Sequence, residues 1–336
     1  MLNARSISQV VGYKPMLSLI LAIWSVIALG MNDDFELHLK GILDSSSSYT
    51  GRIGQYILDS GGKRLRPKIV GLIGSAIGLP QSAFMPFAYT VELMHTASLL
   101  HDDVVDGTEL RRSRPTANQI FGDKPALLAG DFISASAMET MCALGDMRLA
   151  MSVVRTIKKM SEGELMELEH SHSFHDSKEV YLKIIYLKTA SLFELCSVGT
   201  GIIAGLSEKA LDALASFGRL VGMGFQIADD IINVSPDESD NKDAFNDILE
   251  GKSTLPLVIL FKKRPEVLRK AATFSSPEEK KDYIVSKLDK EILRSSRAIA
   301  QEYLDMSLQT LHESGYLTKE LSDITHQIIA QVETRF

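Results

Sequence analysis

Two long apolar runs of this chain end in paired aspartates, and both runs have the periodicity of an α-helix. In residues 207–234, SEKALDALASFGRLVGMGFQIADDIINV, apolar side chains recur at helical spacing behind Ser207, a suitable N-cap. The recurring positions are Leu211, Leu214, Ala215, Phe217, Leu220 and Val221. The segment before Gly107 is the other run, and the sequence lacks alternating strand-like runs. The pattern predicts an all-α fold.

Helix start signals elsewhere in the chain agree with this prediction. Asp176 with Glu179, and Ser276 with Glu279, are expected to open helices as capping boxes. With 336 residues, of which 45% are hydrophobic, the chain can bury a large core. Because no repeat or composition shift marks a boundary, we expect one domain over residues 31–336.

Residues 1–30 form an apolar extension whose status the sequence leaves open. Residues 16–30, MLSLILAIWSVIALG, carry no charge but are short for a bilayer-spanning helix, which needs roughly 20 apolar residues. Basic residues before an apolar stretch resemble a secretory signal, although Ala28-Leu29-Gly30 is a poor cleavage site. The alternatives are a first helix packed on the fold and a natural start at Met31, and we favour a non-signal interpretation.

The first acidic cluster lies in the stretch LLHDDVVDGTELRR. Asp102 and Asp106 are four residues apart on the expected helix, so they share a face, with Asp103 beside them. Like charges this close repel one another, and carboxylate oxygens relieve the repulsion by binding a hard cation such as Mg²⁺. Asp229 and Asp230 repeat the pattern at the end of the other run. The two clusters together predict facing walls that hold Mg²⁺ between them.

Basic residues supply the positive charge that binding of a polyanion requires. They stand in GGKRLRP at residues 61–67, directly after the first acidic cluster, and at Lys188, Lys242 and Lys252. Arginine forms multidentate phosphate contacts, and lysine acts on phosphate as a point charge. Acidic walls with basic residues around them therefore predict a diphosphate site, and the net charge of −7 argues against a nucleic-acid partner.

Several motifs of the chain are recognisable when they are read together. GGKRLRP, VELMHTASLLHDDVVDGTELRR, LKTASLF, GFQIADD and EGKSTLP, in this order, resemble the trans-polyprenyl diphosphate synthases, and most of all the bacterial octaprenyl diphosphate synthase-like enzymes. The resemblance runs from about residue 31 to the C-terminus. It implies a single-domain, isoprenoid synthase-type helical bundle around a deep central cavity, acting as a homodimer. It also implies Mg²⁺-dependent elongation of an allylic diphosphate with isopentenyl diphosphate, in successive trans head-to-tail condensations, to a medium- or long-chain product.

The resemblance also implies roles for individual residues. Asp102, Asp103, Asp106, Asp229 and Asp230 would hold Mg²⁺ on the allylic diphosphate, which Arg111, Lys188, Lys242 and Lys252 would contact. Lys63, Arg66, His95 and Arg112 would bind isopentenyl diphosphate, and Thr189 and Gln226 would lie near the reacting carbons. Of these residues, Asp102, Asp103, Lys188, Thr189, Gln226 and Asp229 are the expected catalytic ones. Two positions depart from the family pattern, because Asn233 replaces a third aspartate and Asn241 replaces the glycine before Lys242.

Side chains one turn before Asp102 on the expected helix lie deeper along the same face. In the family, a bulky aromatic side chain at this depth stops the growing chain early. Ala97 and Ser98 are small, so we expect a product longer than geranylgeranyl diphosphate. Met94 and Met138 are candidate walls for that product.

Two other classes of protein share part of this pattern. A class I terpene cyclase would have the helical fold and one aspartate-rich motif, but it would not need GGKRLRP or the paired arginines. A non-catalytic or regulatory subunit of a heteromeric prenyl synthase tends to lose one acidic cluster, and both are largely present here. We therefore favour the enzyme. Two cysteines are too few for a disulfide framework, so we expect a cytoplasmic protein, with a peripheral membrane contact for its lipid product.

Overall fold

The computed structural model describes residues 33–44, 47–111, 114–171, 173–234, 245–316, 318–319, 322–323 and 325–326. The described residues up to Gly61 belong to one compact unit, and those from Gly62 onward belong to another. The predictions for residues 1–30 and for Arg112, Asn241 and Lys242 fall outside the described residues. Among the helices that are described, none has the length and apolar character needed to cross a bilayer.

The smaller unit contains two helices, α3 (Asp33–Ile42) and α4 (Ser48–Asp59). Ser47 is the N-cap of α4, and its hydroxyl oxygen accepts a hydrogen bond from the backbone N–H of Thr50. An ion pair of 2.7 Å between Lys40 Nζ and an Asp59 carboxylate oxygen joins the C-terminal turns of the two helices. Buried apolar side chains from both helices form the contact between them.

The larger unit is helical almost throughout its described length. Its helices are α5 (Leu65–Ile77), α6 (Gln81–Val105), α7 (Ala117–Phe121), α8 (Asp123–Cys142), α9 (Met147–His170), α10 (Lys178–Ile185), α11 (Ser191–Ile203), α12 (Glu208–Asn233), α13 (Asn246–Leu249), α14 (Leu255–Lys263), α15 (Pro265–Ala271), α16 (Pro277–Val285) and α17 (Lys290–Ser314). A π-helical turn, η1 (Tyr186–Ala190), joins α10 to α11. Strands β1 (Leu110–Arg111) and β2 (Arg114–Pro115) pair antiparallel, with Leu110 opposite Pro115. The prediction of an all-α fold is confirmed.

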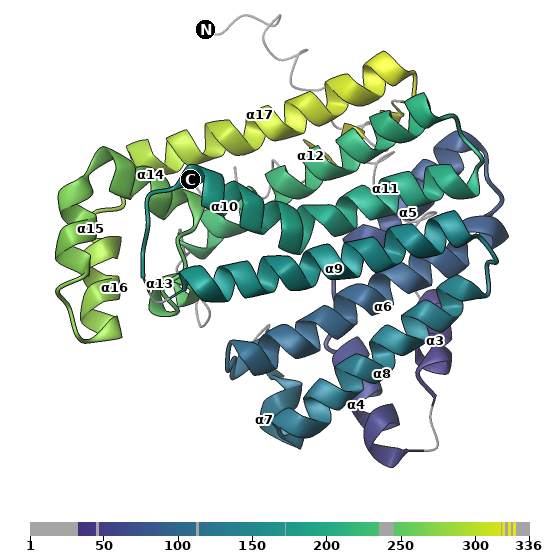
Figure 1. The fold of residues 1–336 in the computed structure, drawn as a ribbon, viewed down its shortest axis with the longest axis horizontal. Helices are drawn as coiled ribbons and strands as arrows, with labels where there is room; N and C mark the ends of the chain where they lie inside the picture. The colour runs from purple at the N-terminus through teal and green to yellow at the C-terminus, as the bar shows by residue number, and fades with distance from the viewer. Residues whose placement is uncertain are drawn as a thin grey trace, which may run out of the picture. The chain divides into compact units, whose positions relative to one another are not determined.

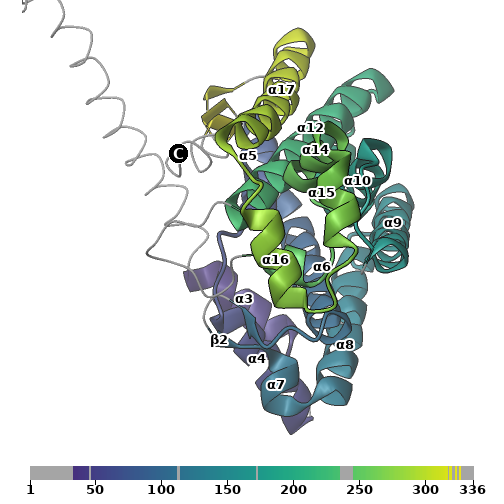
Figure 2. The ribbon, with the colours of Figure 1, turned by 90° about the vertical axis from the view of Figure 1, so that its left-hand side faces the viewer.

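The long helices of the larger unit run side by side, and the short helices α14, α15 and α16 gather at one end (Figure 1). Figure 2 views that end face on. Helix α12 packs against α11 and α17, α6 packs against α5 and α8, and α9 packs against α11 and η1. The apolar stripe predicted for α12 lies in the core, because its residues are buried: Leu211, Leu214, Phe217 and Val221.

The predicted helix caps can be compared with the observed ones. The hydroxyl oxygen of Ser276 accepts from the backbone N–H of Glu279 at 3.4 Å, so this capping prediction is confirmed. The prediction for Asp176 is wrong by one residue. Ser177 is the N-cap of α10, and its hydroxyl oxygen accepts from the N–H of Val180 at 3.2 Å. Aspartate and serine are equally suitable N-caps. The start of α10 is therefore set by the backbone, because Ser177 is the extended residue that directly precedes the helix.

Two glycines allow η1 to lie unusually close to its neighbouring helices. A Cβ at Gly163 of α9 would lie 2.7 Å from the backbone nitrogen of Lys188, and a Cβ at Gly222 of α12 would lie 2.6 Å from Cα of Ala190. Both distances are shorter than real Cβ contacts, so only glycine permits these approaches. The two contacts bring Lys188 next to α9 and Thr189 next to α12, which is where the candidate site lies.

Candidate active site

The first acidic cluster lies at the C-terminal end of α6, as predicted. Asp102 and Asp103 belong to its last turn, and Asp106 is the C-cap, whose backbone N–H donates to the carbonyl oxygen of Asp102 at 2.8 Å. Asp103 is buried, and one of its carboxylate oxygens accepts from Nε of Arg111 at 2.8 Å and lies 2.7 Å from Nη2. The short β1–β2 hairpin therefore directs Arg111 back onto the end of α6.

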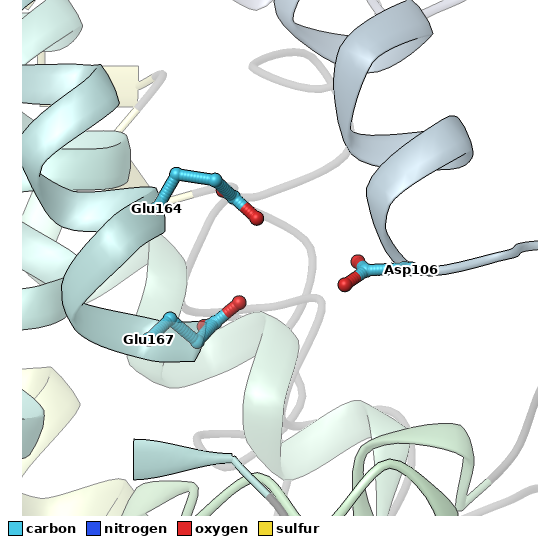
Figure 3. A group of neighbouring side chains, drawn as sticks. All are labelled: Asp106, Glu164 and Glu167. Carbon is cyan, nitrogen blue, oxygen red and sulfur yellow. The ribbon is translucent and has the colours of Figure 1, made fainter. Parts of the chain in front are cut away.

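Three carboxylates from two helices converge at this point. Ligand oxygens of Asp106, Glu164 and Glu167 all lie within 4.8 Å of one another, with Asp106 facing the two glutamates of α9 (Figure 3). One oxygen of Glu164 and one of Asp103 are buried and have no hydrogen-bond partner. Carboxylate oxygens are the ligands that Mg²⁺ prefers, so these side chains fit a hard divalent cation.

Two lysines point into the same group of carboxylates. Lys188 Nζ lies 2.7 Å from Glu164 and 2.6 Å from Glu167, and Lys252 Nζ lies 2.9 Å from Asp106 and 3.4 Å from Glu167. Burial alone would lower the pKa of each ammonium group, but the surrounding carboxylates outweigh burial and raise it. Both lysines therefore keep their positive charge, which in this structure is paired with the carboxylates.

The carboxyl groups respond to burial and to these lysines in different ways. Burial raises the pKa of Asp102 to about 7, and although Lys188 opposes the rise, Glu164 and Asp106 add to it. Burial would also raise the pKa of Glu167, but Lys188 and Lys252 outweigh it and hold the pKa below its ordinary value. The site therefore gathers more negative charge than its own lysines neutralise, and a bound cation would relieve this excess.

The second acidic cluster lies at the end of α12, and its two aspartates differ in their surroundings. Asp229 is exposed, whereas Asp230 is buried. One oxygen of Asp230 accepts from the Tyr181 hydroxyl at 2.6 Å and the other accepts from Nε2 of Gln226 at 2.8 Å. The amide oxygen of Gln226 accepts from the Thr189 hydroxyl at 2.8 Å. This chain of hydrogen bonds fixes the end of α12 to η1, one residue from Lys188.

Asp247 of α13 electrostatically connects the two clusters. Burial raises the pKa of Asp247 to about 7, Lys252 opposes the rise, and Asp229 is among the carboxylates that add to it. Lys252 in turn pairs with Asp106 of the first cluster. The charges of both clusters therefore act on one group of residues around Lys252.

The residues predicted to bind isopentenyl diphosphate lie on α5, α6 and the segment before α5. Lys63 is exposed, and Arg66 is half-buried with its guanidinium group 5.0 Å above the Phe193 ring. Burial lowers the pKa of Arg66, whereas Glu92 and Asp229 raise it. His95 lies on α6, seven residues and so about two turns before Asp102.

The candidate chain-length residues occupy α6 and α8, which pack against each other. Ala97 and Met94 are buried in α6, and Ser98 is half-buried and donates its hydroxyl proton to the carbonyl oxygen of His95. Met138 is half-buried in α8. Ser98 therefore combines a small side chain with some accessibility one turn before Asp102.

Sequence reasoning missed four side chains of this site. Glu164 and Glu167 contact Lys188, Tyr181 contacts Asp230, and Asp247 lies near Lys252. The glutamates did carry a signal, because a spacing of three on a helix places both on one face. In SEGELMELEH, however, they resemble the solvated face of an ordinary surface helix.

Comparisons with known proteins identify the family of this chain. The family model described as polyprenyl synthetase matches residues 48–288. The chain is 38% identical over 217 residues to octaprenyl diphosphate synthase of Escherichia coli, an alignment covering 64% of this chain and 67% of that protein. It is 31% identical over 290 residues to heptaprenyl diphosphate synthase component 2 of Bacillus subtilis, covering 84% and 83%. The crystal structure of a Caulobacter crescentus polyprenyl synthase, complexed with calcium and isoprenyl diphosphate, superposes with a TM-score of 0.81 at 28% identity, covering 94% and 97%.

A helical bundle of this topology, with these relatives, defines an isoprenoid synthase-type enzyme. The chain belongs to the polyprenyl synthetase family and is a trans-prenyltransferase. The predictions of the family, of the fold and of chain elongation are thereby confirmed, and the terpene cyclase and non-catalytic subunit alternatives are not favoured.

Proposed function

We propose that this enzyme condenses isopentenyl diphosphate onto an allylic diphosphate and repeats the reaction until the product is longer than geranylgeranyl diphosphate. The observation that carries the proposal is the convergence of Lys188 and Lys252 on the carboxylates of Asp106, Glu164 and Glu167. A site with cations and oxygen ligands side by side suits a diphosphate bound together with a divalent metal ion.

We assign the allylic diphosphate to the space between the two acidic clusters. Asp102, Asp103 and Asp106 would hold Mg²⁺ from one side, and Asp229 and Asp230 would do so from the other. Glu164 and Glu167 are additional oxygen ligands that the geometry offers. Asn233, where the family pattern has a third aspartate, has a buried side-chain oxygen that lacks a hydrogen-bond partner among the described residues. That oxygen is available as a neutral ligand.

Bound Mg²⁺ would stabilise the negative charge that grows on the diphosphate as the allylic C–O bond breaks. The protein's own cations add to this effect, because Lys188, Lys252 and Arg111 are held in place before the reaction begins. Once the carboxylates bind the metal ion, both lysines become available to the phosphate oxygens. Thr189 and Gln226, fixed by their mutual hydrogen bond, would lie beside the reacting carbons.

Isopentenyl diphosphate is assigned to Lys63, Arg66 and His95, with Arg112 as a further ligand expected from the sequence, and Lys242 is expected to contact the allylic diphosphate. The apolar face of α6 below Asp102 would receive the growing chain. Ala97 and Ser98 leave that path open, and Met94 and Met138 are the proposed walls at its far end. This arrangement supports a medium- or long-chain product.

The experiment that tests this function is an assay with labelled isopentenyl diphosphate, farnesyl diphosphate and Mg²⁺, with the products separated by chain length. The main product is expected to be longer than geranylgeranyl diphosphate. Chelation of the metal ion should stop its formation, and added Mg²⁺ should restore it. Absence of any product, or a product that ends at geranylgeranyl diphosphate or earlier, would contradict the proposal.

We also propose that two copies of the chain form a homodimer. Exposed apolar side chains recur at whole helical turns along one face of α9, at Met147, Met151, Val154, Leu165 and Leu168. Leu128 of α8 is 63% exposed as well. These side chains form one apolar group at each end of the helix face, with Lys158 and Ser161 between the two groups. Exposed apolar groups mark interaction sites, and a second copy of this chain is the occupant that we propose.

The dimer can be tested with a matched pair of variants. Met151 and Met306 are each 43% exposed, on α9 and α17 respectively. Met151→Glu is expected to reduce the native mass, measured by light scattering, from that of two chains toward that of one, because it buries an unpaired charge in the interface. Met306→Glu should leave the mass at two chains. A wild-type protein with the mass of a single chain would refute the homodimer.

The cytoplasmic location and the peripheral membrane contact of the lipid product remain predictions from the sequence. A medium- or long-chain polyprenyl product is too apolar to leave the enzyme freely into water, which supports transfer at a membrane surface.

A further inference from the structure

Arg64, in the segment that precedes α5, has an unfavourable backbone conformation. Its φ is 48° and its ψ is 40°, which is the left-handed helical region. Among the described residues, the other non-glycine residue with a positive φ is Phe245. A left-handed conformation is unfavourable for a residue with a side chain, so neighbouring interactions must hold Arg64 in place.

The interaction that holds Arg64 is an ion pair with Glu92 of α6. Arg64 Nη1 donates to a carboxylate oxygen of Glu92 at 2.6 Å, and the two side chains are only 13% and 4% exposed. A charge buried to this extent needs its partner, because removing one member leaves the other uncompensated. The carbonyl oxygen of Arg64 also accepts a hydrogen bond from the backbone N–H of Lys68, and this bond belongs to the first turn of α5. The pair therefore ties the beginning of α5 to α6.

The residues on both sides of Arg64 are those assigned to isopentenyl diphosphate. Lys63 precedes it and Arg66 follows two residues later, while Glu92 stands one turn before His95 on α6. Nε of Arg66 is buried without a hydrogen-bond partner, as expected for a donor whose acceptor is a ligand. Glu92 also stabilises the charge of Arg66, whose pKa burial otherwise lowers. One ion pair thus sets the distance between three substrate ligands.

We infer that Arg64 is a positioning residue, which acts through its ion pair with Glu92 to hold Lys63 and Arg66 opposite His95 for the diphosphate of isopentenyl diphosphate. The inference rests on the proposed function, since that function assigns these three residues to this substrate. The side chain of Arg64 is turned toward Glu92, so the proposed role is to position the residues on either side of it. Losing the pair should therefore weaken the binding of isopentenyl diphosphate and leave the allylic site unchanged.

The test uses Arg64→Gly, Glu92→Gln and Arg64→Lys. Glycine accepts the left-handed conformation, so Arg64→Gly removes the ion pair without adding strain. Arg64→Gly and Glu92→Gln are each expected to raise KM for isopentenyl diphosphate about 10- to 100-fold, the loss typical of residues that orient a ligand without contacting the bound group. We expect kcat and KM for the allylic substrate to stay close to wild type. Arg64→Lys keeps a charge and should recover part of the loss.

A matched control breaks a different arginine–carboxylate pair. Arg148 Nη2 lies 2.7 Å from Glu208, and both side chains are largely exposed. Arg148→Gly should leave both KM values unchanged, because exposed ion pairs contribute little. Thermal unfolding of every variant separates a general loss of stability from a local change.

Direct binding distinguishes a failure of this inference from a failure of the proposed function. If the wild type forms no elongated product, the proposed function fails, and calorimetric binding of isopentenyl diphosphate still decides the role of Arg64. Weaker binding of isopentenyl diphosphate by both Arg64→Gly and Glu92→Gln, with KM for the allylic substrate unchanged, supports the inference even where the unfolding temperature falls, because loss of a buried charge partner also lowers stability. Unchanged binding, or equal losses of both KM values and kcat together with a lower unfolding temperature, overturns it.

Discussion

The Asp102→Asn and Asp229→Asn variants are each expected to lose about 10³-fold in kcat, the upper range for removing one preorganised electrostatic contact from an active site. Each substitution keeps the shape of the side chain but removes the negative charge that we propose as a ligand of Mg²⁺. Asp102 lies at the end of α6 and Asp229 at the end of α12. Equal losses from opposite helices would follow if both carboxylates hold the same metal–diphosphate group. Steady-state kinetics at saturating Mg²⁺ measure the effect.

The matched control for this prediction is Asp212→Asn. Asp212 lies on α12 with Asp229 but is exposed more than four turns before it, toward the helix N-terminus. We expect wild-type kinetics from this variant. Wild-type activity of Asp229→Asn would contradict the assignment of Asp229 as a metal ligand.

The Ser98→Phe variant is expected to shorten the main product to geranylgeranyl diphosphate. Ser98 is half-buried and stands one turn before Asp102 on α6, so a phenyl ring there would block the path of the growing chain. The first condensation needs no such depth and should continue. Products of the standard assay, separated by chain length, measure the change.

Ala97→Phe is the less informative of the two aromatic substitutions. Ala97 is only 1% exposed, so a phenyl ring would overpack the core and cost about 1–3 kcal/mol of stability. Leu99→Phe serves as the control for Ser98→Phe, because position 99 lies about 100° further around the helix. An unchanged product distribution from Ser98→Phe would reject the proposed direction of the chain.

The helices that carry the acidic clusters could be predicted because their signals are local. The apolar stripe at Leu211, Leu214 and Phe217 sets the buried face of α12, and a spacing of four sets the common face of Asp102 and Asp106. Such patterns depend on the geometry of one helix alone. The resemblance to the family then indicated that the two acidic clusters hold the same diphosphate, which no local pattern can show.

Other parts of the site depend on how distant segments pack, and local patterns did not reveal them. The π-helical turn at residues 186–190 brings Lys188 to Glu164 and Glu167, and it can do so because Gly163 has no Cβ. Similarly, the side chain of Arg64, whose backbone is left-handed, pairs with Glu92, which is 28 residues away. Contacts of this kind appear only in the folded chain.

The different surroundings of Asp229 and Asp230 on α12 are also a result of packing. Sequence reasoning treated Asp229 and Asp230 as equivalent metal ligands. In the fold, both oxygens of Asp230 already accept hydrogen bonds from Tyr181 and Gln226, while Asp229 is exposed. A substitution of Asp229 therefore leaves the hydrogen bonds of Asp230 in place, and Asp229→Asn is the more specific variant on α12.

The most direct test of the proposed site is a crystal structure of the enzyme with Mn²⁺ and an unreactive thio-diphosphate analogue of the allylic substrate. Anomalous scattering locates Mn²⁺, which takes the same oxygen ligands as Mg²⁺. We predict Mn²⁺ bound by Asp102 and Asp106 of α6 and by Asp229 of α12, with the diphosphate of the analogue between the two helices and in contact with Lys188. Mn²⁺ bound without any ligand from α12, or a diphosphate that lies away from α6, would contradict the account.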